Sequence, residues 1–287
     1  EGSKAFAKEV MLAAGIPTAG HGVFTAVEPA LAWARARGGR VVVKADGLAA
    51  GKGVVVCGAL DEAEAALRSI LLDRVHGAAG ASVVVEERLS GPEASCIAFT
   101  DGERVRLLPS AQDHKRIFDG DRGPNTGGMG AFSPSPQVTP EVGRLVEERV
   151  LLPAVREMAR RGRPFRGALY AGLMLTADGP KVLEFNARLG DPETQPILLR
   201  MSSDIVPALL AAARGDLSGA EMEFDRFFGR ADAHGKAIVS LGEGRSESVG
   251  VGTEGLRIFS FVDLFVAQKD VQAAGAGGEK LNFGFVG

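Results

Sequence analysis

Residues 40–56 read RVVVKADGLAAGKGVVV. Its two valine-rich runs, 40–44 and 54–57, are typical of buried strands, and the glycine-rich segment 47–53 joins them, which predicts a strand–loop–strand hairpin. Backbone N–H groups of glycines can approach phosphate oxygens closely, and lysines neutralise phosphate charge. The hairpin is therefore a candidate phosphate cradle, with its candidate contacts at Lys44, Gly47, Gly51, Lys52 and Gly53.

This loop differs from a Walker A loop, which has four residues between its glycines and a Ser or Thr after the lysine. Here three residues separate Gly47 from Gly51, and Gly53 follows Lys52. The alternative interpretation is a mobile hairpin tip whose lysines are solvated. The residues of this loop leave both interpretations open.

Outward from the hairpin, helical and strand patterns interleave without strict alternation. Glycine-punctuated apolar runs predict several antiparallel strand pairs, which favours an α+β fold over a doubly wound sheet. Segment 110–136 shows no periodicity, and a structureless stretch of that length is usually disordered or functional. The expected helices are 4–14, 60–73, 139–161, one from 191 and one from 204, and the expected strands are 40–44, 54–57, 82–87, 94–100, 104–108, 168–176 and 181–185.

Composition excludes several classes of protein. The 287 residues are 45% hydrophobic, and 33 basic against 36 acidic residues leave a formal charge of −3, which argues against a broad nucleic-acid face. The two cysteines, Cys57 and Cys96, form no CxxC pattern, so a disulfide scaffold is not expected and a reducing cytoplasm fits. No Gly-x-Ser-x-Gly elbow and no strand-linked Gly-x-Gly-x-x-Gly occurs, which argues against an α/β-hydrolase and a dinucleotide dehydrogenase.

A second candidate site is the strand end at residues 86–93, EERLSGPE. Glu86 and Glu87 end an apolar run, and the Gly-Pro pair then breaks it, as an interdomain hinge would. The backbone there can read an adenine edge, and Glu93 can accept hydrogen bonds from ribose hydroxyls. The alternative is an ordinary solvated strand end.

A third candidate lies in EFNARLGDPE, residues 184–193. Glu184 and Asn186 are two apart on a predicted strand, so their side chains share one face. Two oxygen ligands suit Mg²⁺, which takes one or two protein carboxylates and completes its shell with water and phosphate. Arg188 extends the same face and can clamp a carboxylate or phosphate. The alternative is a polar strand edge followed by a helix cap at Asp191.

A fourth candidate is QDHKR, residues 112–116, inside the aperiodic segment. Both signs of charge occur there among glycines. This composition suits a substrate that carries a phosphate together with an amine or hydroxyls.

Together these segments resemble the phosphoribosylamine–glycine ligase family of the ATP-grasp superfamily, over residues 1–217. The stretches that carry the resemblance are EGSKAFAKEVMLAAGIPTA, VVKADGLAAGKGVVV, LLPSAQDHKRIFDGDRGPNTGGMGAFSP, LYAGLML and EFNARLGDPETQ. The resemblance implies an ATP-grasp fold, in which two α+β subdomains enclose ATP. It implies an ATP-grasp domain at 1–217, with a small lid at about 18–87, and an unassigned segment at 218–287.

The resemblance also implies roles for single residues. Lys4 and Lys44 would lie near the α- and β-phosphates, and 47–53 would close over the triphosphate. Residues Glu86, Glu87 and Leu89 would form the adenine hinge, and Glu93 would bind ribose. Glu184 and Asn186 would hold Mg²⁺ or Mn²⁺, and the residues around glycine, phosphoribosylamine and the acyl phosphate would be Asp113, Lys115, Arg188 and Asp191.

The reaction implied by the resemblance has two steps. The carboxylate of glycine attacks the γ-phosphorus of ATP, giving glycyl phosphate and ADP, and the amine of phosphoribosylamine then displaces phosphate. Such chemistry depends on positioning and charge neutralisation rather than on a nucleophilic side chain. We expect a cytoplasmic monomer that acts on small molecules, with no nucleic-acid or membrane partner.

The sequence departs from the family pattern in three places. The family's N-terminal domain is expected to be missing ahead of residue 1, and residues 225–287 match no family segment. Gly91-Pro92-Glu93 also replaces the usual Gly-Glu-Glu. Two alternatives stay open: another ATP-grasp carboxylate–amine ligase, or an ATP-binding remnant without turnover.

Overall fold

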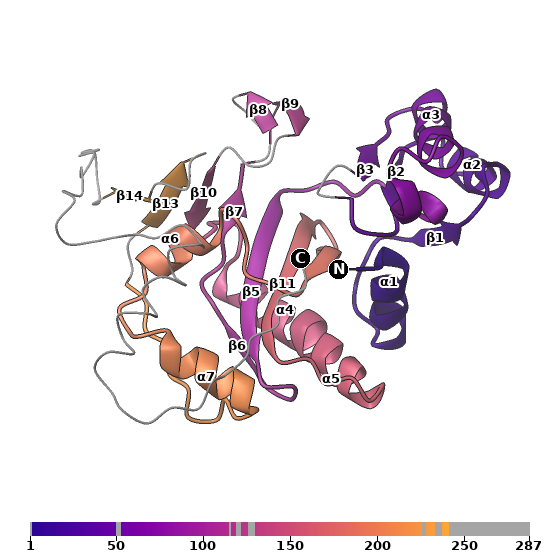
Figure 1. Cartoon of the computed structure of the whole chain (residues 1–287). Coiled ribbons are helices and arrows are strands. Elements are labelled where there is room, and N and C mark those ends of the chain that lie inside the picture. The colour runs from indigo at the N-terminus through magenta and orange to yellow at the C-terminus, as the bar shows by residue number, and fades with distance from the viewer. Residues whose placement is uncertain are drawn as a thin grey trace. The chain divides into compact units, whose positions relative to one another are not determined.

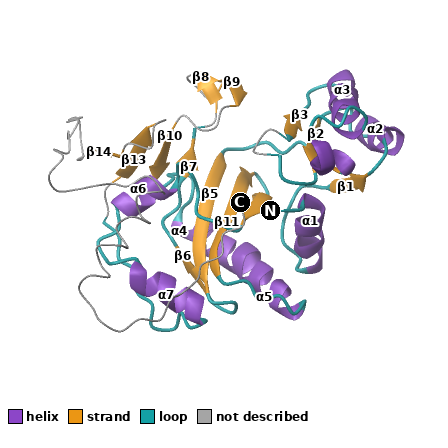
Figure 2. Cartoon of the chain, in the orientation of Figure 1, coloured by secondary structure: helices purple, strands orange, loops and turns teal. Residues whose placement is uncertain are grey.

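The computed structural model describes most of the first 240 residues, and structural statements below concern only these. The chain divides into two compact units, residues 1–247 and 248–287, and none of the described residues belongs to the second. The described ranges are 2–49, 53–114, 116–118, 122–125, 130–225, 228–232 and 237–240, with side chains left out at 116–118, 122–125, 228–232 and 237–240. Figure 2 shows helices and strands interleaved throughout this part, which confirms the α+β class.

A small antiparallel sheet contains the hairpin from which the sequence analysis began (Figure 1). Its strand order is β1-β4-β2-β3, and β2 pairs with β3 as predicted. Helices α2 and α3 pack their small and aliphatic residues against the valines of the sheet and close a separate core. The bounds are β1 His21–Phe24, α2 Val27–Arg35, β2 Val41–Ala45, β3 Val54–Val56, α3 Leu60–Leu71, a 3₁₀ turn Gly77–Ala81 and β4 Val83–Glu87.

A larger antiparallel sheet has the order β12-β11-β5-β6. One of its faces packs against α1 and against a long helix that a π-helical turn interrupts at Glu147–Leu151, within the predicted helix 139–161. Ser3 caps α1 by accepting a hydrogen bond from the N–H of Phe6. The bounds are α1 Lys4–Ala13, β5 Glu93–Thr100, β6 Val105–Leu107, α4 Pro140–Val146, α5 Leu152–Arg160, β11 Gly167–Thr176 and β12 Gly179–Asn186.

The opposite face of the larger sheet forms another core with α6 and α7. Ile97, Phe99 and Tyr170 point to this side and pack with Ile197 of α6 (Thr194–Leu199) and Ala208 of α7 (Val206–Arg214). Side chains alternate along a strand, so this face also receives Glu184 and Asn186 of β12 through their register with β11. The face that packs against α1 and the long helix is thus mainly apolar, whereas the opposite face is apolar at one end and polar at the other.

Segment 110–136, which showed no periodicity, is not structureless. The structure places short strands in it, and β10 pairs with both β7 and β13 in a sheet of order β14-β13-β10-β7. The partner of Gly130 is Asp232, a hundred residues later, so local pattern carried no sign of this pairing. The bounds are β7 Gln112–Asp113, β8 Arg116–Phe118, β9 Arg122–Asn125, β10 Gly130–Ser133, β13 Phe228–Asp232 and β14 Ala237–Ser240.

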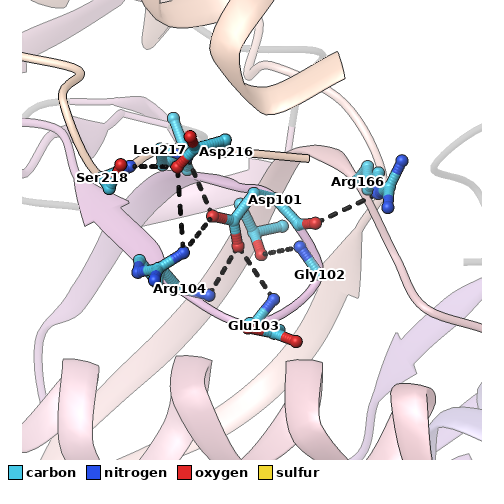
Figure 3. A network of polar contacts seen from close by, with 9 residues as sticks. Asp101, Gly102, Glu103, Arg104, Arg166, Asp216, Leu217 and Ser218 are labelled. Carbon is cyan, nitrogen blue, oxygen red and sulfur yellow. Dashed lines mark hydrogen bonds and ion pairs between the residues drawn. The ribbon is translucent and has the colours of Figure 1, made fainter. Parts of the chain in front are cut away.

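A network of polar contacts lies at one end of the larger sheet, at the turn between β5 and β6 (Figure 3). The Asp101 carboxylate accepts hydrogen bonds from the backbone N–H groups of Glu103 (2.9 Å) and Arg104 (2.7 Å), and from that of Leu217 after α7 (2.9 Å). Arg166 donates to the Asp101 carbonyl at 3.1 Å. We call this set the turn network; it fastens the residues that follow α7 to the sheet.

Among the described residues, no helix is both long and apolar enough to span a membrane. The division of the chain at residue 217 and the lid bounds of about 18–87 stay predictions.

Candidate active site

The candidate metal pair lies at the end of β12. Asn186 Nδ2 lies 3.2 Å from Glu184 Oε1, and both side chains are half-buried on the face of the sheet that α6 and α7 cover. The two residues therefore share one face, as their spacing predicts. Rotation of the Asn186 amide would bring its oxygen beside the carboxylate, because the two orientations of an amide have nearly the same shape.

These two residues fit a hard divalent cation. Mg²⁺ needs only one or two protein oxygens when phosphate and water complete its octahedron. Glu184 supplies one negative oxygen ligand and Asn186 a neutral one, in a half-buried position. In the part of the chain described here, no cluster of three or more His, Cys, Asp or Glu offers a competing site with more ligands.

The loop after β12 carries the next two predicted residues. Arg188 and Asp191 are both exposed. One Arg188 guanidinium nitrogen donates to the Leu189 carbonyl at 2.9 Å, and Asp191 Oδ1 accepts from Gln195 Nε2 at 3.0 Å. Both residues follow the metal pair closely in the sequence, and their exposed side chains are accessible to a ligand.

Lys44 of β2 reaches across to the larger sheet. Its Nζ donates to the carbonyl of Leu183 at 2.9 Å, directly before Glu184 in the chain. Leu183 is the unpaired residue where the β11–β12 register shifts, because Gly172 pairs with Glu184 and Leu173 with Val182. A bulge in β12 thus frees the carbonyl that holds the predicted phosphate-binding lysine beside the predicted metal ligand.

Lys44 belongs to a buried cluster that sequence analysis did not anticipate. Glu86 Oε1 lies 3.0 Å from Lys44 Nζ and 3.1 Å from Lys8 Nζ, and all three side chains are at most 8% exposed. Lys8 of α1 also donates to Thr18 Oγ1 at 2.6 Å, and Thr18 donates to the Val182 carbonyl at 2.7 Å. We call Lys8, Thr18, Lys44 and Glu86 the junction cluster, because it joins α1, the small sheet and β12.

The charges of the junction cluster favour an anion. Two ammonium groups lie against one carboxylate, with Lys44 Nζ at 3.0 Å and Lys8 Nζ at 3.1 Å from Glu86 Oε1. Lys44 Nζ also reaches the backbone of β12 directly before Glu184. A phosphate group beside Lys44 would be attracted by both ammonium groups.

Lys4 is positioned by the root of the glycine-rich loop. Its Nζ donates to the Gly47 carbonyl at 3.1 Å, and its backbone N–H donates to the Asp46 carbonyl at 3.0 Å. The Asp46 carboxylate in turn accepts from Ser3, from the N–H of Ala5 and from Ser82. The structure therefore brings Lys4 and the start of this loop together, and the contact of Lys4 with a phosphate stays a prediction.

The glycine-rich loop is described only at its ends. Gly47 donates its N–H to the Ala79 carbonyl at 3.2 Å, and the Gly53 carbonyl accepts from the N–H of Ala45 at 2.8 Å. Both ends are thus tied to the small sheet and its neighbouring turn. The predicted contacts Gly51 and Lys52 lie outside the described residues.

The predicted adenine hinge connects β4 to β5. Glu86 points inward to the lysines, whereas Glu87 Oε1 accepts from the N–H of Gly20 at 3.0 Å, so neither carboxylate is directed freely to solvent. Leu89 is half-buried, and Glu93 is exposed at the start of β5, opposite Met174 of β11.

The remaining predicted residues come from the QDHKR segment. Asp113 is half-buried in β7 and pairs with Ala131. Ala111, two residues earlier, exchanges both backbone hydrogen bonds with Ser95 of β5, so this segment is fixed beside the larger sheet. Lys115 lies outside the described residues.

A match to a known family covers residues 2–194. The matching model is described as the phosphoribosylglycinamide synthetase, ATP-grasp (A) domain. It includes the junction cluster, the glycine-rich loop, the hinge and the metal pair.

Curated relatives agree with this match. A phosphoribosylamine–glycine ligase of Allochromatium vinosum is 58% identical over 226 residues, covering 78% of this chain and 53% of the relative. One of Salmonella typhimurium is 50% identical over 264 residues, covering 92% and 61%. The chain thus spans about half to three fifths of the length of these relatives.

Solved structures give the same fold. The crystal structure of a phosphoribosylamine–glycine ligase from Thermotoga maritima superposes with a TM-score of 0.73 at 36% identity, covering 81% of this chain and 58% of that one. A biotin carboxylase domain from Hydrogenobacter thermophilus has a TM-score of 0.62 at 22% identity, covering 80% and 49%, which shows the fold alone. By its matching model and its relatives, the chain belongs to the phosphoribosylglycinamide synthetase family and contains that family's ATP-grasp domain.

Proposed function

We propose that this chain supplies the ATP-binding and acyl-phosphate-forming site of a phosphoribosylamine–glycine ligase. ATP would lie between the small sheet and β12, with Mg²⁺ or Mn²⁺ on Glu184 and Asn186. The observation that carries the proposal is the placement of Lys44: a buried ammonium that is paired with Glu86 and donates to the carbonyl of the residue before Glu184. The relatives named above act, by their names, on phosphoribosylamine and glycine.

In the proposed first step, a carboxylate oxygen of glycine forms a bond to the γ-phosphorus of ATP, and the bond to the bridging oxygen of ADP breaks. Lys44 and Lys4 would neutralise phosphate charge, and Arg188 would orient the carboxylate. The metal, when bound, supplies charge neutralisation on the phosphate oxygens.

In the proposed second step, the amine of phosphoribosylamine attacks the carbonyl carbon of glycyl phosphate. The carbon–oxygen bond to phosphate breaks, and the amine loses a proton as the amide forms. Asp113, Lys115 and Asp191 would surround these groups. No side-chain nucleophile is required, because positioning and electrostatic stabilisation are the main sources of rate in such chemistry.

The test is ADP formation by the protein with ATP and Mg²⁺, offered glycine, alanine, serine or β-alanine, with and without phosphoribosylamine. The proposal predicts ADP with glycine alone among these acids, together with glycinamide ribonucleotide when phosphoribosylamine is added. Equal rates with all four acids would indicate a different carboxylate–amine ligase. ATP binding without any ADP formation would indicate a binding remnant.

Glu184→Gln tests the metal pair within the same assay. Loss of the only charged ligand should lower the rate at least about a hundredfold, since one electrostatic contact to the transition state is worth that much. Asp178→Asn is the matched control, because Asp178 is an acidic residue on the same β11–β12 hairpin and its side chain is 84% exposed. The control should retain the full rate, and an unchanged rate in Glu184→Gln would refute the metal assignment.

A further inference from the structure

A buried polar cluster lies beneath the loop that carries Arg188 and Asp191. Glu193 Oε1 accepts a hydrogen bond from Tyr170 Oη at 2.8 Å and another from Ser95 Oγ at 2.9 Å, and the two hydroxyl oxygens lie 2.8 Å apart. Their exposed fractions are only 3% for Glu193, 5% for Tyr170 and 4% for Ser95. Three polar side chains from β5, β11 and the loop thus meet away from water.

The cluster shares a sheet face with the candidate metal pair. In the β11–β12 ladder Tyr170 lies opposite Asn186, and Gly172 lies opposite Glu184, while Ser95 pairs with Gly172 from the other side. Directly opposed residues point to the same face. Ser95 and Tyr170 are therefore next to the metal pair across the strands.

Gly172 lets these groups approach one another. A Cβ atom there would lie 3.3 Å from Glu184 Cγ and 3.4 Å from Tyr170 Cε1, so a side chain would press on both. Burial and the nearby charges of Glu193 and Glu184 raise the pKa of Tyr170. Its phenol is consequently protonated at neutral pH and donates to Glu193.

The loop is fixed at both ends. Its first end follows directly from β12 at Asn186, and its last end is Glu193, whose carbonyl also accepts the N–H of Ile197 in α6. A Cβ atom at Gly190 would lie 2.5 Å from Glu193 Oε2, so the backbone of the loop packs against the carboxylate itself. Thr194 donates its hydroxyl to the Gly190 carbonyl and tightens this turn.

A carboxylate is a costly choice for this position. The neighbours on this face are Ile97, Phe99, Ile197 and Ala208, and an apolar side chain among them would avoid the desolvation of a charge. The carboxylate is held instead by two directed hydrogen bonds, which fix its position far more narrowly than apolar contact does. Compared with an apolar side chain at this position, the hydrogen-bonded carboxylate therefore defines the conformation of the loop more narrowly.

We infer that Glu193, clasped by Tyr170 and Ser95, is a positioning residue that holds loop 187–192 in the conformation in which Arg188 and Asp191 face the substrate carboxylate. This inference rests on the proposed function for its substrate and on the contacts of Glu193 with Tyr170 and Ser95 for its mechanism. Glu193 acts through the loop and does not touch the reacting atoms.

The first test measures the loop directly, by amide hydrogen exchange over residues 187–192 in the whole protein. Glu193→Ala and Tyr170→Phe should speed this exchange about tenfold or more, because a hydrogen bond to a charged group that holds the loop is lost. Glu193→Gln keeps an acceptor oxygen and should stay within about threefold of the unsubstituted protein. Unchanged exchange in Glu193→Ala would overturn the inference.

Thr100→Val is the matched control for loss of a buried hydroxyl. Thr100 lies on the same strand as Ser95, is fully buried, and accepts the N–H of Gly102 at 3.1 Å. The substitution should lower stability without changing exchange over 187–192. Equal acceleration in Thr100→Val and Tyr170→Phe would show that any loss of stability loosens the loop, and would overturn the inference.

The second test is kinetic and uses the glycine-dependent ADP assay. Glu193→Ala and Tyr170→Phe should lower kcat/KM for glycine by about tenfold to a hundredfold, the scale of a misplacement near 1 Å, while KM for ATP changes less than about twofold. Glu193→Gln should restore most of the loss. A Gln variant as impaired as the Ala variant would show that the negative charge itself is needed and would overturn the positioning role.

The two tests separate this inference from the proposed function. Absence of glycine-dependent ADP formation in the unsubstituted protein would refute the proposed function, and the exchange measurement would still decide whether Glu193 holds the loop. Faster exchange with an unchanged kcat/KM for glycine would overturn the inference and leave the proposed function standing.

Discussion

Glu86 and Asp101 are both carboxylates buried in the same chain, 2% and 3% exposed, but their partners differ in kind. Glu86 is held by the ammonium groups of Lys8 and Lys44, which end long side chains. Asp101 is held by three backbone N–H groups and by the half-exposed guanidinium of Arg104 at 3.3 Å (Figure 3). The first arrangement places two positive charges against one carboxylate. The second surrounds a carboxylate with four hydrogen-bond donors, three of them backbone N–H groups.

The difference indicates what each site is for. The backbone N–H groups of the turn network are held in place by the fold and already donate to Asp101. Their role is therefore to stabilise the fold. Lys44 instead reaches β12, where its ammonium group donates to the carbonyl of Leu183 next to the candidate metal pair. The junction cluster therefore both joins α1, the small sheet and β12 and places a positive charge beside that pair, whereas the turn network surrounds a carboxylate mainly with backbone N–H groups.

The largest expected loss of stability is that of Glu86→Gln. It removes the carboxylate that lies against the buried ammonium groups of Lys8 and Lys44, and breaking a buried ion pair in this way costs about 3–5 kcal/mol. Urea unfolding followed by the fluorescence of Trp33, the single tryptophan, which lies in α2, would measure it. The double variant Lys8→Met with Glu86→Gln should lose less than the two single losses added, because it removes one charge of each sign. Additive losses would mean that the two groups do not interact.

Asp101→Asn should have a smaller effect and no effect on the site. Burial raises the pKa of Asp101, but the hydrogen bonds from Arg104, Leu217 and Glu103 outweigh it and lower the pKa from 3.8 to about 2. That difference corresponds to about 2 kcal/mol of stability at neutral pH. Asp216→Asn is the control, because Asp216 belongs to the same network but its side chain is 69% exposed, and it should change stability by less than about 0.5 kcal/mol. Equal losses in the two variants would contradict the distinction.

The loss of unfolding free energy at acid pH also depends on Asp101. Because the pKa of Asp101 is lower in the folded than in the unfolded chain, the unfolded chain binds more protons between pH 3.8 and about 2. Its contribution is therefore complete above pH 4 and is lost as pH falls through this window. Hydrogen bonds from Arg160 and then Arg161 also lower the pKa of Glu157 to about 2, so the unsubstituted protein loses stability there from both groups.

Asp101→Asn isolates one of these two groups. Unfolding free energies measured from pH 5 to pH 2 should fall less steeply in Asp101→Asn than in the unsubstituted protein. Curves of identical slope would show that Asp101 does not titrate in this window.

Local sequence patterns predict much of the fold. The features that they do not predict depend mostly on contacts between residues far apart in the sequence. The valine runs predicted β2 and β3, and the apolar periodicity of residues 60–73 predicted α3. The sequence analysis predicts neither β1, which has only four residues, nor α2, which carries Pro29 near its start, a residue that usually marks a loop or a helix boundary. The strands within 110–136 escaped prediction because glycine and polar residues there hide the alternation on which strand prediction depends.

The candidate site likewise contains residues that local spacing predicts and residues whose roles depend on distant partners. The sequence places Glu184 and Asn186 side by side because both lie on one strand, where spacing alone fixes the face, and their role as metal ligands stays a prediction. Lys8 and Glu193 were missed because their roles depend on distant partners: Glu86 is 78 positions from Lys8 in the sequence, and Ser95 is 98 positions from Glu193. On sequence alone, Lys8 is indistinguishable from a solvated lysine of an amphipathic helix.

Calorimetric titration of MgATP tests the central claim, that the junction cluster and not the turn network meets the nucleotide. The account predicts that Lys44→Met weakens MgATP binding by roughly tenfold to a hundredfold, since a charge-assisted hydrogen bond is lost, and that Lys8 still neutralises Glu86 so that the fold is retained. Asp101→Asn, measured beside it, should bind MgATP within about twofold of the unsubstituted protein. A folded Lys44→Met variant with unchanged affinity, or an Asp101→Asn variant as weak as Lys44→Met, would contradict the account.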